Sequence, residues 1–505
     1  MSSEYFDVAI VGAGLSGIGT ARHLQDKCPD KTYVVLEGRK SMGGTWDLFR
    51  FPGIRSDSDM YTLGYNFKPW RAGKSIADGP SILNYIRETA AEGEVDQHIR
   101  YNHLVRKAEW STGDACWTIH AERRGTGEAT TIRCGFILMC AGYYSYEHGY
   151  TPEFPGRERF RGTIVHPQQW PEDLDYRDKR VVVIGSGATA VTLIPAMAAD
   201  AAHVVMVQRS PTYMVARPDT DVIANLLRKV LPEKVAYAIT RWKNIRFQQV
   251  VYRRTRTHPD RVRKKLLDLV RKEVGPDYDV DTHFAPRYNP WDQRLCLVPN
   301  SDFFESLNAG RSSIVTGHID TFTETGVRMQ SGEELEADII ITATGLDLVL
   351  LGGTELFVDG EPVRPADTFS YMGMMYSDVP NLVTTFGYIN ASWTLRADLT
   401  AEYACRIINH MDQNGYRQCT PRLRPEERDM PARNWITEFS SGYMQRVMHL
   451  FPKQGDRAPW LNTQNYGEDR KLLLRRDVDD GVLEFRNPAS EFTEPAADML
   501  ASDAA

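Results

Sequence analysis

The chain has 505 residues, more than the about 250–300 at which a single hydrophobic core stops growing, so it must form at least two domains. Its hydrophobic content of 42%, charged content of 25% and net charge of −7 are typical of a globular protein. No run of residues approaches the ~18 apolar residues of a membrane-spanning helix.

The seven cysteines include no Cys-x-x-Cys and no Cys-x-x-x-x-Cys pair. This spacing argues against a disulfide framework, a zinc site and a redox dithiol, so we expect reduced thiols and no metal. The sequence enters a predicted strand without a basic region or a cleavable apolar segment before it, and we therefore expect a cytoplasmic location.

The first predicted unit is a buried strand at residues 8–11, a glycine-rich turn and a helix. Gly12 permits the tight turn, Gly14 lets the backbone approach a pyrophosphate, and Gly17 lets the helix pack on the strand. The next strand ends in Glu37, 20 residues after Gly17. A carboxylate there accepts hydrogen bonds from ribose hydroxyls and repels a 2′-phosphate, which predicts an FAD or NAD site. The alternative is that Glu37 is a solvated strand end.

Residues 43–46 and 51–57 have too little periodicity for a helix and too much aromatic content for a solvent loop. We therefore expect a loop folded over a cofactor, with Gly44, Thr45 and Trp46 in contact with it.

A meander and a closing strand complete the first half of the predicted domain. A helix is predicted at residues 81–91, and a buried strand at residues 136–142. Between them, polar and apolar residues alternate in three segments, which predicts an antiparallel meander: 105–110, 116–121 and 130–133.

Residues 160–171, Phe-Arg-Gly-Thr-Ile-Val-His-Pro-Gln-Gln-Trp-Pro, lie just before a second glycine-rich turn. Two cofactor domains must therefore meet near residue 170. A histidine beside proline and tryptophan in a linker is more often part of a packed loop than a functional group, and we assign His166 no proton-transfer role.

The second predicted domain repeats the first with one change in chemistry. A buried strand runs into a turn that contains Gly185, Gly187 and Ala190. The following strand ends in an amide, then Arg209 and Ser210, where an NAD site would have an acid. A fork of donors at this place favours the 2′-phosphate of NADPH, although Arg209 as a mere surface arginine is the alternative.

A closing strand at residues 338–345 mirrors the one at residues 136–142. This internal duplication predicts an α/β protein with two dinucleotide-binding, Rossmann-like domains. We expect the following boundaries: FAD-binding domain at 1–145 and 348–485, interdomain linker at 146–175, NADPH-binding domain at 176–347 with a basic helical insertion at 215–290, and a disordered acidic tail at 486–505.

Residues 228–273 are strongly basic, with 15 Lys/Arg and four Asp/Glu, so this segment carries +11 while the rest of the chain carries −18. A helical pair with turns near residues 232, 258–259 and 275–276 is predicted. Three interpretations stay open: a solvated helical face, steering of NADPH phosphates, and contact with an anionic membrane surface. Nothing in the segment requires a nucleic acid.

The return segment brings the chain back to the first domain. Residues 390–394 offer small and hydroxyl groups where a helix begins, a suitable approach to a flavin pyrimidine. Trp393 and Trp460 are candidates for the wall of an apolar substrate cavity, although core packing is the more common role.

The spacing Phe-x-Gly-x-x-x-His-x-x-x-Trp-Pro at 160–171 matches the motif that distinguishes Baeyer–Villiger monooxygenases from other flavin monooxygenases. The chain resembles this family from Asp7 to about Glu484. Three further segments resemble the branch that includes the ethionamide-activating monooxygenase: residues 54–59, 288–300 and 387–394.

The resemblance implies FAD and NADPH as cofactors and O2 as a substrate. NADPH would reduce the flavin, and a C4a-peroxyflavin would insert one oxygen atom into a small hydrophobic ketone to give an ester or lactone. By family position Arg294 is the active-site cation, Asp57 orients it and lies behind the flavin, and Asp59 is the local competitor of Asp57. The family often has Lys before the arginine; this chain has Gln293, which weakens the inference of NADPH selectivity.

Three alternatives stay open beside ketone oxygenation. The first is an enzyme that mainly oxygenates sulfur or nitrogen in sulfides and amines. The second is a flavoprotein disulfide reductase, disfavoured by the absence of a cysteine pair. The third, from another class, is a peripheral membrane-binding protein whose nucleotide sites are structural. The natural substrate and the oligomeric state do not follow from the sequence.

Overall fold

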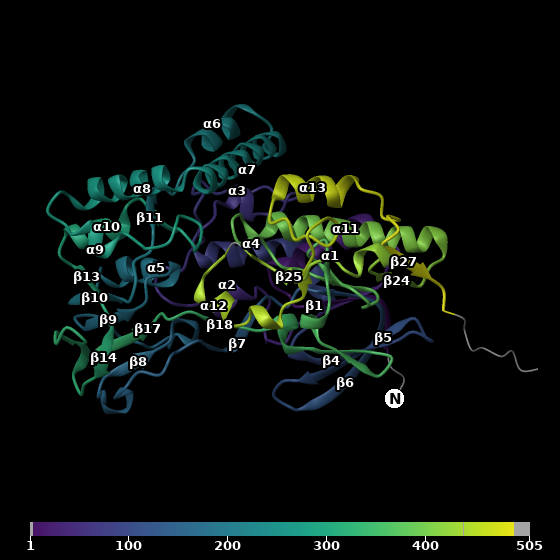
Figure 1. Cartoon of the computed structure of the whole chain (residues 1–505), viewed down its shortest axis with the longest axis horizontal. Coiled ribbons are helices and arrows are strands. Elements are labelled where there is room, and N and C mark those ends of the chain that lie inside the picture. The colour runs from purple at the N-terminus through teal and green to yellow at the C-terminus, as the bar shows by residue number, and fades with distance from the viewer. Residues whose placement is uncertain (1–3, 438, 489–505) are drawn as a thin grey trace, which may run out of the picture.

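The computed structural model describes residues 4–437 and 439–488, and it has two α/β lobes side by side (Figure 1). Most of the predicted tail, from residue 489 onward, lies outside the described residues. The two-lobed α/β architecture confirms the predicted fold class. No helix of the described residues is long and apolar enough to cross a membrane.

A parallel sheet forms the centre of the first lobe. Its first strand pairs in parallel with the second strand on one side and with the closing strand on the other. Helices α1 (Leu15–Lys27) and α11 (Trp393–Asn414) pack against each other on this lobe. The parallel strands are β1 (Glu4–Val11), β2 (Tyr33–Leu36), β3 (Ile99–Arg100), β6 (Glu128–Met139) and β23 (Leu382–Thr384).

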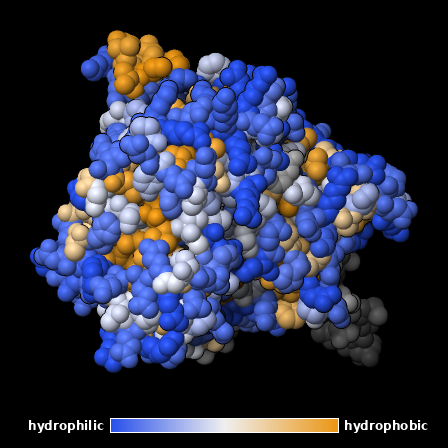
Figure 2. All heavy atoms as spheres, turned by 60° about the vertical axis from the view of Figure 1, so that its left-hand side comes forward, coloured by the Kyte–Doolittle hydropathy of each residue, from blue (hydrophilic) through white to orange (hydrophobic). Residues whose placement is uncertain are grey.

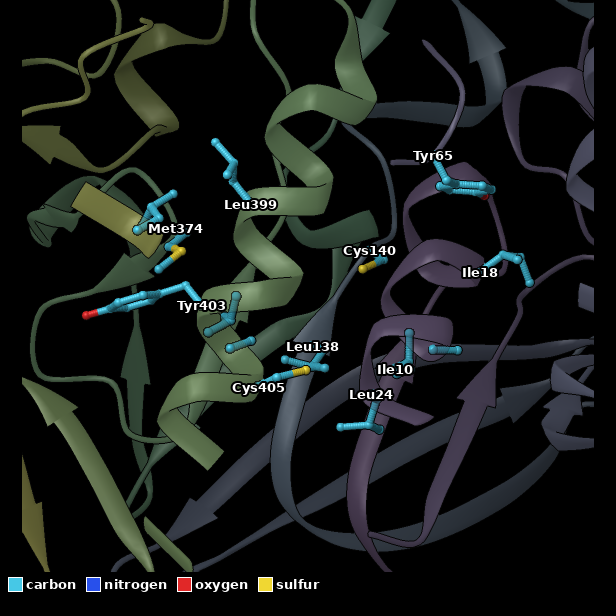
Figure 3. Packing of buried hydrophobic residues seen from close by; sticks show 14 of the residues in the cluster. Ile10, Ile18, Leu24, Tyr65, Leu138, Cys140, Met374, Leu399, Tyr403 and Cys405 are labelled. Carbon is cyan, nitrogen blue, oxygen red and sulfur yellow. The ribbon is translucent and has the colours of Figure 1, made fainter. Parts of the chain in front are cut away.

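The core of this lobe joins segments that are almost 400 residues apart in the chain. Ile10 from β1 and Ile18 and Leu24 from α1 face the same buried cluster as Leu399 and Tyr403 from α11 (Figure 3). Burial of apolar side chains stabilises the fold by roughly 25 cal/mol per Å². The return segment is therefore an integral part of the first lobe.

The predicted meander is present, but its third strand is longer than expected. Strands β4 (His103–Ser111) and β5 (Cys116–Arg123) form the antiparallel pair, and β6 continues it. The two strands predicted at 130–133 and 136–142 are thus one strand, which is a correction. In the first part of β6 polar and apolar residues alternate because one face is exposed, whereas its last four residues are all buried. In the sequence this change of pattern resembles a boundary between two strands.

The segment that we predict to contact a cofactor contains a helical turn that the sequence did not indicate. Residues Thr45–Leu48 form α2, a single turn that is too short to show a 3.6-residue period. Asp47 in this turn is buried and forms ion pairs with Arg39 at 2.9 Å, Arg50 at 3.1 Å and Arg87 at 3.4 Å. These contacts fix the position of the turn.

The second lobe has a fully parallel five-stranded sheet in the order β13-β10-β9-β17-β8. Part of the predicted linker belongs to it, because β8 pairs in parallel with β17. Helix α5 (Ala188–Met197) covers this sheet. The strands are β8 (Thr163–Val165), β9 (Arg180–Ile184), β10 (His203–Gln208), β13 (Ser312–Thr316) and β17 (Ile339–Thr342).

The duplication is visible at the first glycine of each turn. Gly12 has a φ of +101°, and a Cβ added there would lie 2.5 Å from the Cys140 carbonyl oxygen at the end of β6. Gly185 has a φ of +135°, and its Cβ would lie 2.3 Å from the Ala343 carbonyl oxygen after β17. Both turns therefore need glycine for the same two reasons, a left-handed φ and contact with the closing strand.

The basic segment forms three helices instead of the predicted pair, and the breaks fall at the expected turns. Helices α6 (Val222–Val230), α7 (Glu233–Thr257) and α8 (Pro259–Val274) cross the top of the molecule in Figure 1. The middle helix packs on α3 (Met60–Leu63) of the first lobe.

Further helices and strands complete the two lobes. The helices are α4 (Gly79–Glu92), α9 (Val280–His283), α10 (Asp302–Asn308), α12 (Gly442–Gln445) and α13 (Tyr466–Arg475). Two separate pairs of strands are β7 (Tyr144–Gly149) with β18 (Leu346–Leu348), and β11 (Met214–Arg217) with β12 (Cys296–Pro299). The outer strands include β14 (Ile319–Phe322), β15 (Gly326–Met329), β16 (Glu334–Glu336), β19 (Glu355–Val358), β20 (Glu361–Val363), β24 (Gln418–Pro421) and β27 (Leu483–Arg486).

A buried ion pair anchors α7 on the first lobe. The Arg241 guanidinium contacts Asp398 of α11 at 3.1 Å, and the same carboxylate contacts His23 of α1 at 3.2 Å. Arg241 also donates to the backbone carbonyls of Tyr61 at 2.9 Å and Gly64 at 2.6 Å. The Arg241 side chain thus joins α3 and α11 of the first lobe to the basic segment, and Asp398 links this contact to α1.

We expect Arg241→Met to lower the free energy of unfolding by about 3–5 kcal/mol, because it removes the guanidinium from the buried Asp398 carboxylate, which is left with His23 and the Asn66 N–H. Arg246→Met on the exposed side of the same helix is the matched control, with an expected change within about 0.5 kcal/mol. Urea denaturation followed by circular dichroism measures both. Equal effects of the two substitutions would show that the ion pair does not anchor α7.

Candidate active site

A cavity with a volume of about 950 Å³ lies between the two lobes and is lined by both glycine-rich turns. It brings together most of the predicted site residues: Gly14, Gly44, Thr45, Trp46, Asp57, Gly185, Gly187, Arg209, Ser210 and Arg294. The others lie behind its wall: Gly12, Gly17, Glu37 and Ala190. A cavity with two nucleotide-type turns is suited to two cofactors that must meet.

The first turn has the features of a site for a phosphate-containing group. Gly14 is the N-cap of α1, no side chain caps this helix end, and its first turn contains no acid, so backbone N–H groups are left for an anion. A Cβ at Gly44 would lie 3.1 Å from the Gly14 Cα, so two bare stretches of backbone face each other here. Thr45 beside them accepts a hydrogen bond from the Tyr144 hydroxyl.

Glu37 is buried behind this turn, which excludes its interpretation as a solvated strand end. Its carboxylate accepts hydrogen bonds from the backbone N–H of Ala13 at 2.8 Å and of Arg39 at 2.9 Å. Burial raises the pKa of Glu37, and these two N–H groups oppose the shift. Ribose binding by Glu37 stays a prediction.

The second turn has an equivalent helix end and a more open surface. Gly187 is the N-cap of α5, again without a side-chain cap, and a Cβ added there would meet no atom within 4 Å. Arg209 and Ser210 are exposed and line the cavity beside it. Gln208 points away, because its side-chain amide donates to the His283 carbonyl at 2.8 Å and to Thr316 at 2.9 Å. The predicted fork therefore consists of Arg209 and Ser210 without the amide.

Arg294 lines the cavity from the loop just before β12. This strand pairs in parallel with β11, and Thr212 beside β11 donates to the Arg294 carbonyl oxygen at 3.4 Å. Burial lowers the pKa of Arg294, whereas the Tyr443 and Tyr143 hydroxyls and the Asp57 carboxylate raise it, with a net upward direction. The guanidinium is therefore a fixed positive charge in the cavity.

The structure distinguishes Asp57 from its competitor Asp59. Asp59 caps α3 by accepting from the Thr62 N–H at 3.1 Å, and it also accepts from Asn244 at 2.9 Å and Gln248 at 3.1 Å on α7. Asp57 instead lines the cavity, and the surface that it exposes faces this cavity. Asp59 thus has a structural role, and Asp57 is the carboxylate available to the site.

Desolvation raises the pKa of Asp57, while the positive charges of Arg294 and Arg55 oppose this rise. Within the described residues Asp57 and Arg294 form no ion pair at 4.0 Å or less. Ser56 fixes the backbone of this segment through bonds to Ser58 in both directions, at 2.7 and 2.9 Å.

Aromatic residues that the sequence analysis missed form part of the wall. Tyr143 lies between β6 and β7 and stacks on Trp393 with 5.1 Å between ring centroids, and Trp393 donates to Ser16 at 2.8 Å. Tyr443 on α12 also lines the cavity, and it lies close enough to Arg294 to raise the pKa of the guanidinium. A pair of tyrosines just after the closing strand was a usable signal for Tyr143, but nothing in the sequence marked Tyr443. Trp460 is fully buried in the core and does not line this cavity.

The two crossings between the lobes are tied to each other. Strands β7 and β18 pair antiparallel, and the Tyr150 N–H donates to the Gly345 carbonyl at 3.1 Å. His166 accepts from the Gln168 N–H through Nδ1, so its Nε2–H donates to the Gly345 carbonyl at 3.2 Å. Burial lowers the pKa of His166, which favours this neutral form. Both ring nitrogens are thus engaged in holding the joint.

Comparisons with known proteins agree with this geometry. Residues 76–269 match the family model for flavin-binding monooxygenase-like proteins, and residues 10–70 match that for the NAD(P)-binding Rossmann-like domain. The FAD-containing monooxygenase EthA of Mycobacterium tuberculosis (strain CDC 1551 / Oshkosh) is 53% identical over 489 residues, which cover 96% of this chain and 99% of that protein. The probable FAD-binding monooxygenase AlmA of Acinetobacter baylyi is 46% identical over 483 residues, with coverages of 95% and 96%.

The likeness extends to solved structures. A structure of oxidized steroid monooxygenase bound to NADP has a TM-score of 0.77 to this chain at 22% identity, covering 95% of this chain and 99% of that one. Two dinucleotide-binding lobes around one cavity are typical of proteins that bind two nucleotide cofactors. The chain belongs to the family of FAD-containing monooxygenases, in the branch of EthA, and the resemblance drawn from residues 160–171 is confirmed.

Proposed function

We propose that this flavin monooxygenase binds FAD at the Gly12–Gly17 turn and NADPH at the Gly185–Ala190 turn. It inserts one oxygen atom of O2 into small hydrophobic ketones to give esters or lactones, and it also oxidises sulfides. The observation that carries the proposal is Arg294, a fixed cation in the cavity that both turns line. When bound, FAD supplies the redox chemistry and the activation of oxygen.

The residues of the chain bind the two cofactors, orient the active-site cation and shield the cavity from water. The uncapped ends of α1 and α5 supply N–H donors for the two pyrophosphates, and Glu37 supplies acceptors for the ribose of FAD. Arg294 stabilises the negative charge that develops on the substrate oxygen when the carbonyl is attacked. Asp57 and Tyr443 set the position of its guanidinium. Tyr143 and Trp393 give the cavity an aromatic wall that limits access of water.

The test is analysis of products by mass spectrometry, with a ketone and a sulfide of similar size supplied separately together with NADPH. An ester or lactone that carries one atom of labelled O2 supports ketone oxygenation. Sulfoxide without any ester would favour the second candidate, an enzyme that mainly oxygenates sulfur. The aromatic wall is the observation that favours this second candidate. Oxygen transfer to a sulfide requires an apolar cavity, but it forms no oxyanion that a cation must stabilise.

Arg209→Ala tests the choice of reductant. We expect it to raise the KM for NADPH about tenfold or more and to leave the KM for NADH nearly unchanged. Only NADPH has the 2′-phosphate that the guanidinium is proposed to bind. Arg209 lines the cavity and is exposed, and it has no ion pair among the described residues that would compete for it. Steady-state kinetics with both coenzymes measures the effect.

Arg217→Ala is the matched control for this experiment. Arg217 lies at the end of β11, eight residues after Arg209, but its guanidinium contacts the Phe247 ring and does not line the cavity. We expect the control to leave both KM values unchanged. Equal increases for NADPH and NADH in Arg209→Ala would show that Arg209 does not discriminate between the coenzymes.

A further inference from the structure

Helix α6 exposes an apolar face that none of the described residues covers. Figure 2 shows an orange, hydrophobic group of atoms projecting at the top of the molecule, where Figure 1 places α6. Apolar side chains are rarely clustered on the outside of a helix without a binding partner. Four residues of this nine-residue helix are each more than half exposed: Val222, Ile223, Leu226 and Val230.

The first half of α7 extends this face. Val235, Ile239 and Trp242 are spaced at i, i+4 and i+7, so they lie in one stripe along the helix. Trp242 is 63% exposed. The two helices pack on each other, and Lys243 of α7 contacts the Asp221 cap of α6 at 2.6 Å. We name these seven apolar residues of α6 and α7 the α6–α7 surface.

Basic side chains border the α6–α7 surface. Lys229, Lys234 and Arg246 are exposed, and within the described residues none of them forms an ion pair. The segment 228–273 carries a net charge of +11 in a chain whose total is −7. Two copies of this face would repel each other, so a second copy of the chain is a poor partner. An anionic surface attracts it.

The same stripe borders a deep groove with a volume of about 1810 Å³, which lies between α7 and α13. Trp242 and Arg246 both line this groove. Arg433, Arg470 and Lys471 add cations on the opposite side, next to apolar residues such as Ile436 and Leu474. A groove with apolar walls and cationic edges fits molecules that have an apolar chain and an anionic head.

We propose that the α6–α7 surface docks the protein peripherally on an anionic lipid surface. The apolar face of α6 enters the interfacial region, and the flanking lysines and arginines contact the anionic headgroups. Trp242 lies at the depth of the headgroups, where an amphipathic ring is favoured. The groove beside it then opens toward the lipid, so an apolar substrate can reach the protein without crossing water.

The test is co-sedimentation of the FAD-loaded full chain with vesicles of phosphatidylcholine alone and with vesicles in which about a third of the lipid is phosphatidylglycerol. We expect binding to the anionic vesicles to be about tenfold stronger and to fall with added salt. The double variant Ile223→Glu/Leu226→Glu should lose about tenfold or more of that binding. Lys229→Glu/Arg246→Glu should reduce it as well and weaken its dependence on salt.

Leu450→Glu is the matched control, because Leu450 is an exposed aliphatic residue (46%) outside α6 and α7. It should bind vesicles as the wild type does. All variants should keep the wild-type flavin content and melting temperature, which shows that they fold. Equal binding of both vesicle types overturns the proposal, and so does full binding by the α6 double variant. A wild-type dimer that the α6 variant converts to a monomer, without vesicle binding, would show that a second copy occupies the surface.

Discussion

Arg294→Ala is expected to keep its FAD and to lose ester formation from ketones, with a fall of about 10²–10³ in the rate of product formation. The guanidinium is a fixed cation in the cavity, where Tyr443 and Asp57 both raise its pKa. Without it, we expect the negative charge that develops on the substrate oxygen to lack a positive partner in the site. The measurement is ester formed per NADPH oxidised, since oxidation of NADPH without product separates loss of oxygenation from loss of reduction.

Arg294→Lys is the conservative partner of this variant. We expect it to restore little ester formation, because a compact ammonium cannot reproduce the planar fork that contacts two groups at once. Sulfide oxidation should fall less than ketone oxidation in both variants, because oxygen transfer to sulfur creates no carbon oxyanion. An alanine variant that makes ester with wild-type coupling would show that Arg294 has only a structural role, and the proposed active site would be wrong.

The sequence predicts the fold of this protein well because the fold is duplicated. Each lobe begins with a strand and a glycine turn and ends with a closing strand that touches the first glycine, and these local features occur twice in the same order. The prediction of secondary structure fails at two places. Strand β6 passes from a half-exposed part to a fully buried part, and α2 is only one turn long. Periodicity cannot identify either feature.

The site is less visible than the fold in the sequence, because tertiary contacts decide which of several similar residues face the cavity. The sequence does not distinguish Asp57 from Asp59. In the structure, side chains of α7, almost 200 residues later, donate hydrogen bonds to Asp59. Gln208 has the chemistry of a third donor for the coenzyme, but it is bound to His283 and Thr316. Tyr443 enters from a segment without any motif. Only the folded chain makes these assignments.

Gly14→Ala is expected to leave a folded protein that has lost about tenfold or more of its FAD. Gly14 has a φ of −80°, which alanine adopts readily, and the added Cβ would lie 3.5 Å from the Gly44 Cα, an ordinary contact. The folded chain itself therefore tolerates the methyl group, with a stability change within about 1 kcal/mol for a helix cap. The pyrophosphate does not, because it needs the bare backbone at this point.

Gly17→Ala separates the two roles of the glycine turn. Its Cβ would lie 1.8 Å from the Gly12 carbonyl oxygen, so α1 could no longer pack on β1, and we expect a loss of stability of about 3 kcal/mol or more with or without flavin. Flavin absorbance after desalting and thermal unfolding by circular dichroism distinguish the variants. If Gly14→Ala keeps its FAD, the turn at residues 12–17 is not where the pyrophosphate lies. If it unfolds as Gly17→Ala does, Gly14 is needed by the chain rather than by the cofactor.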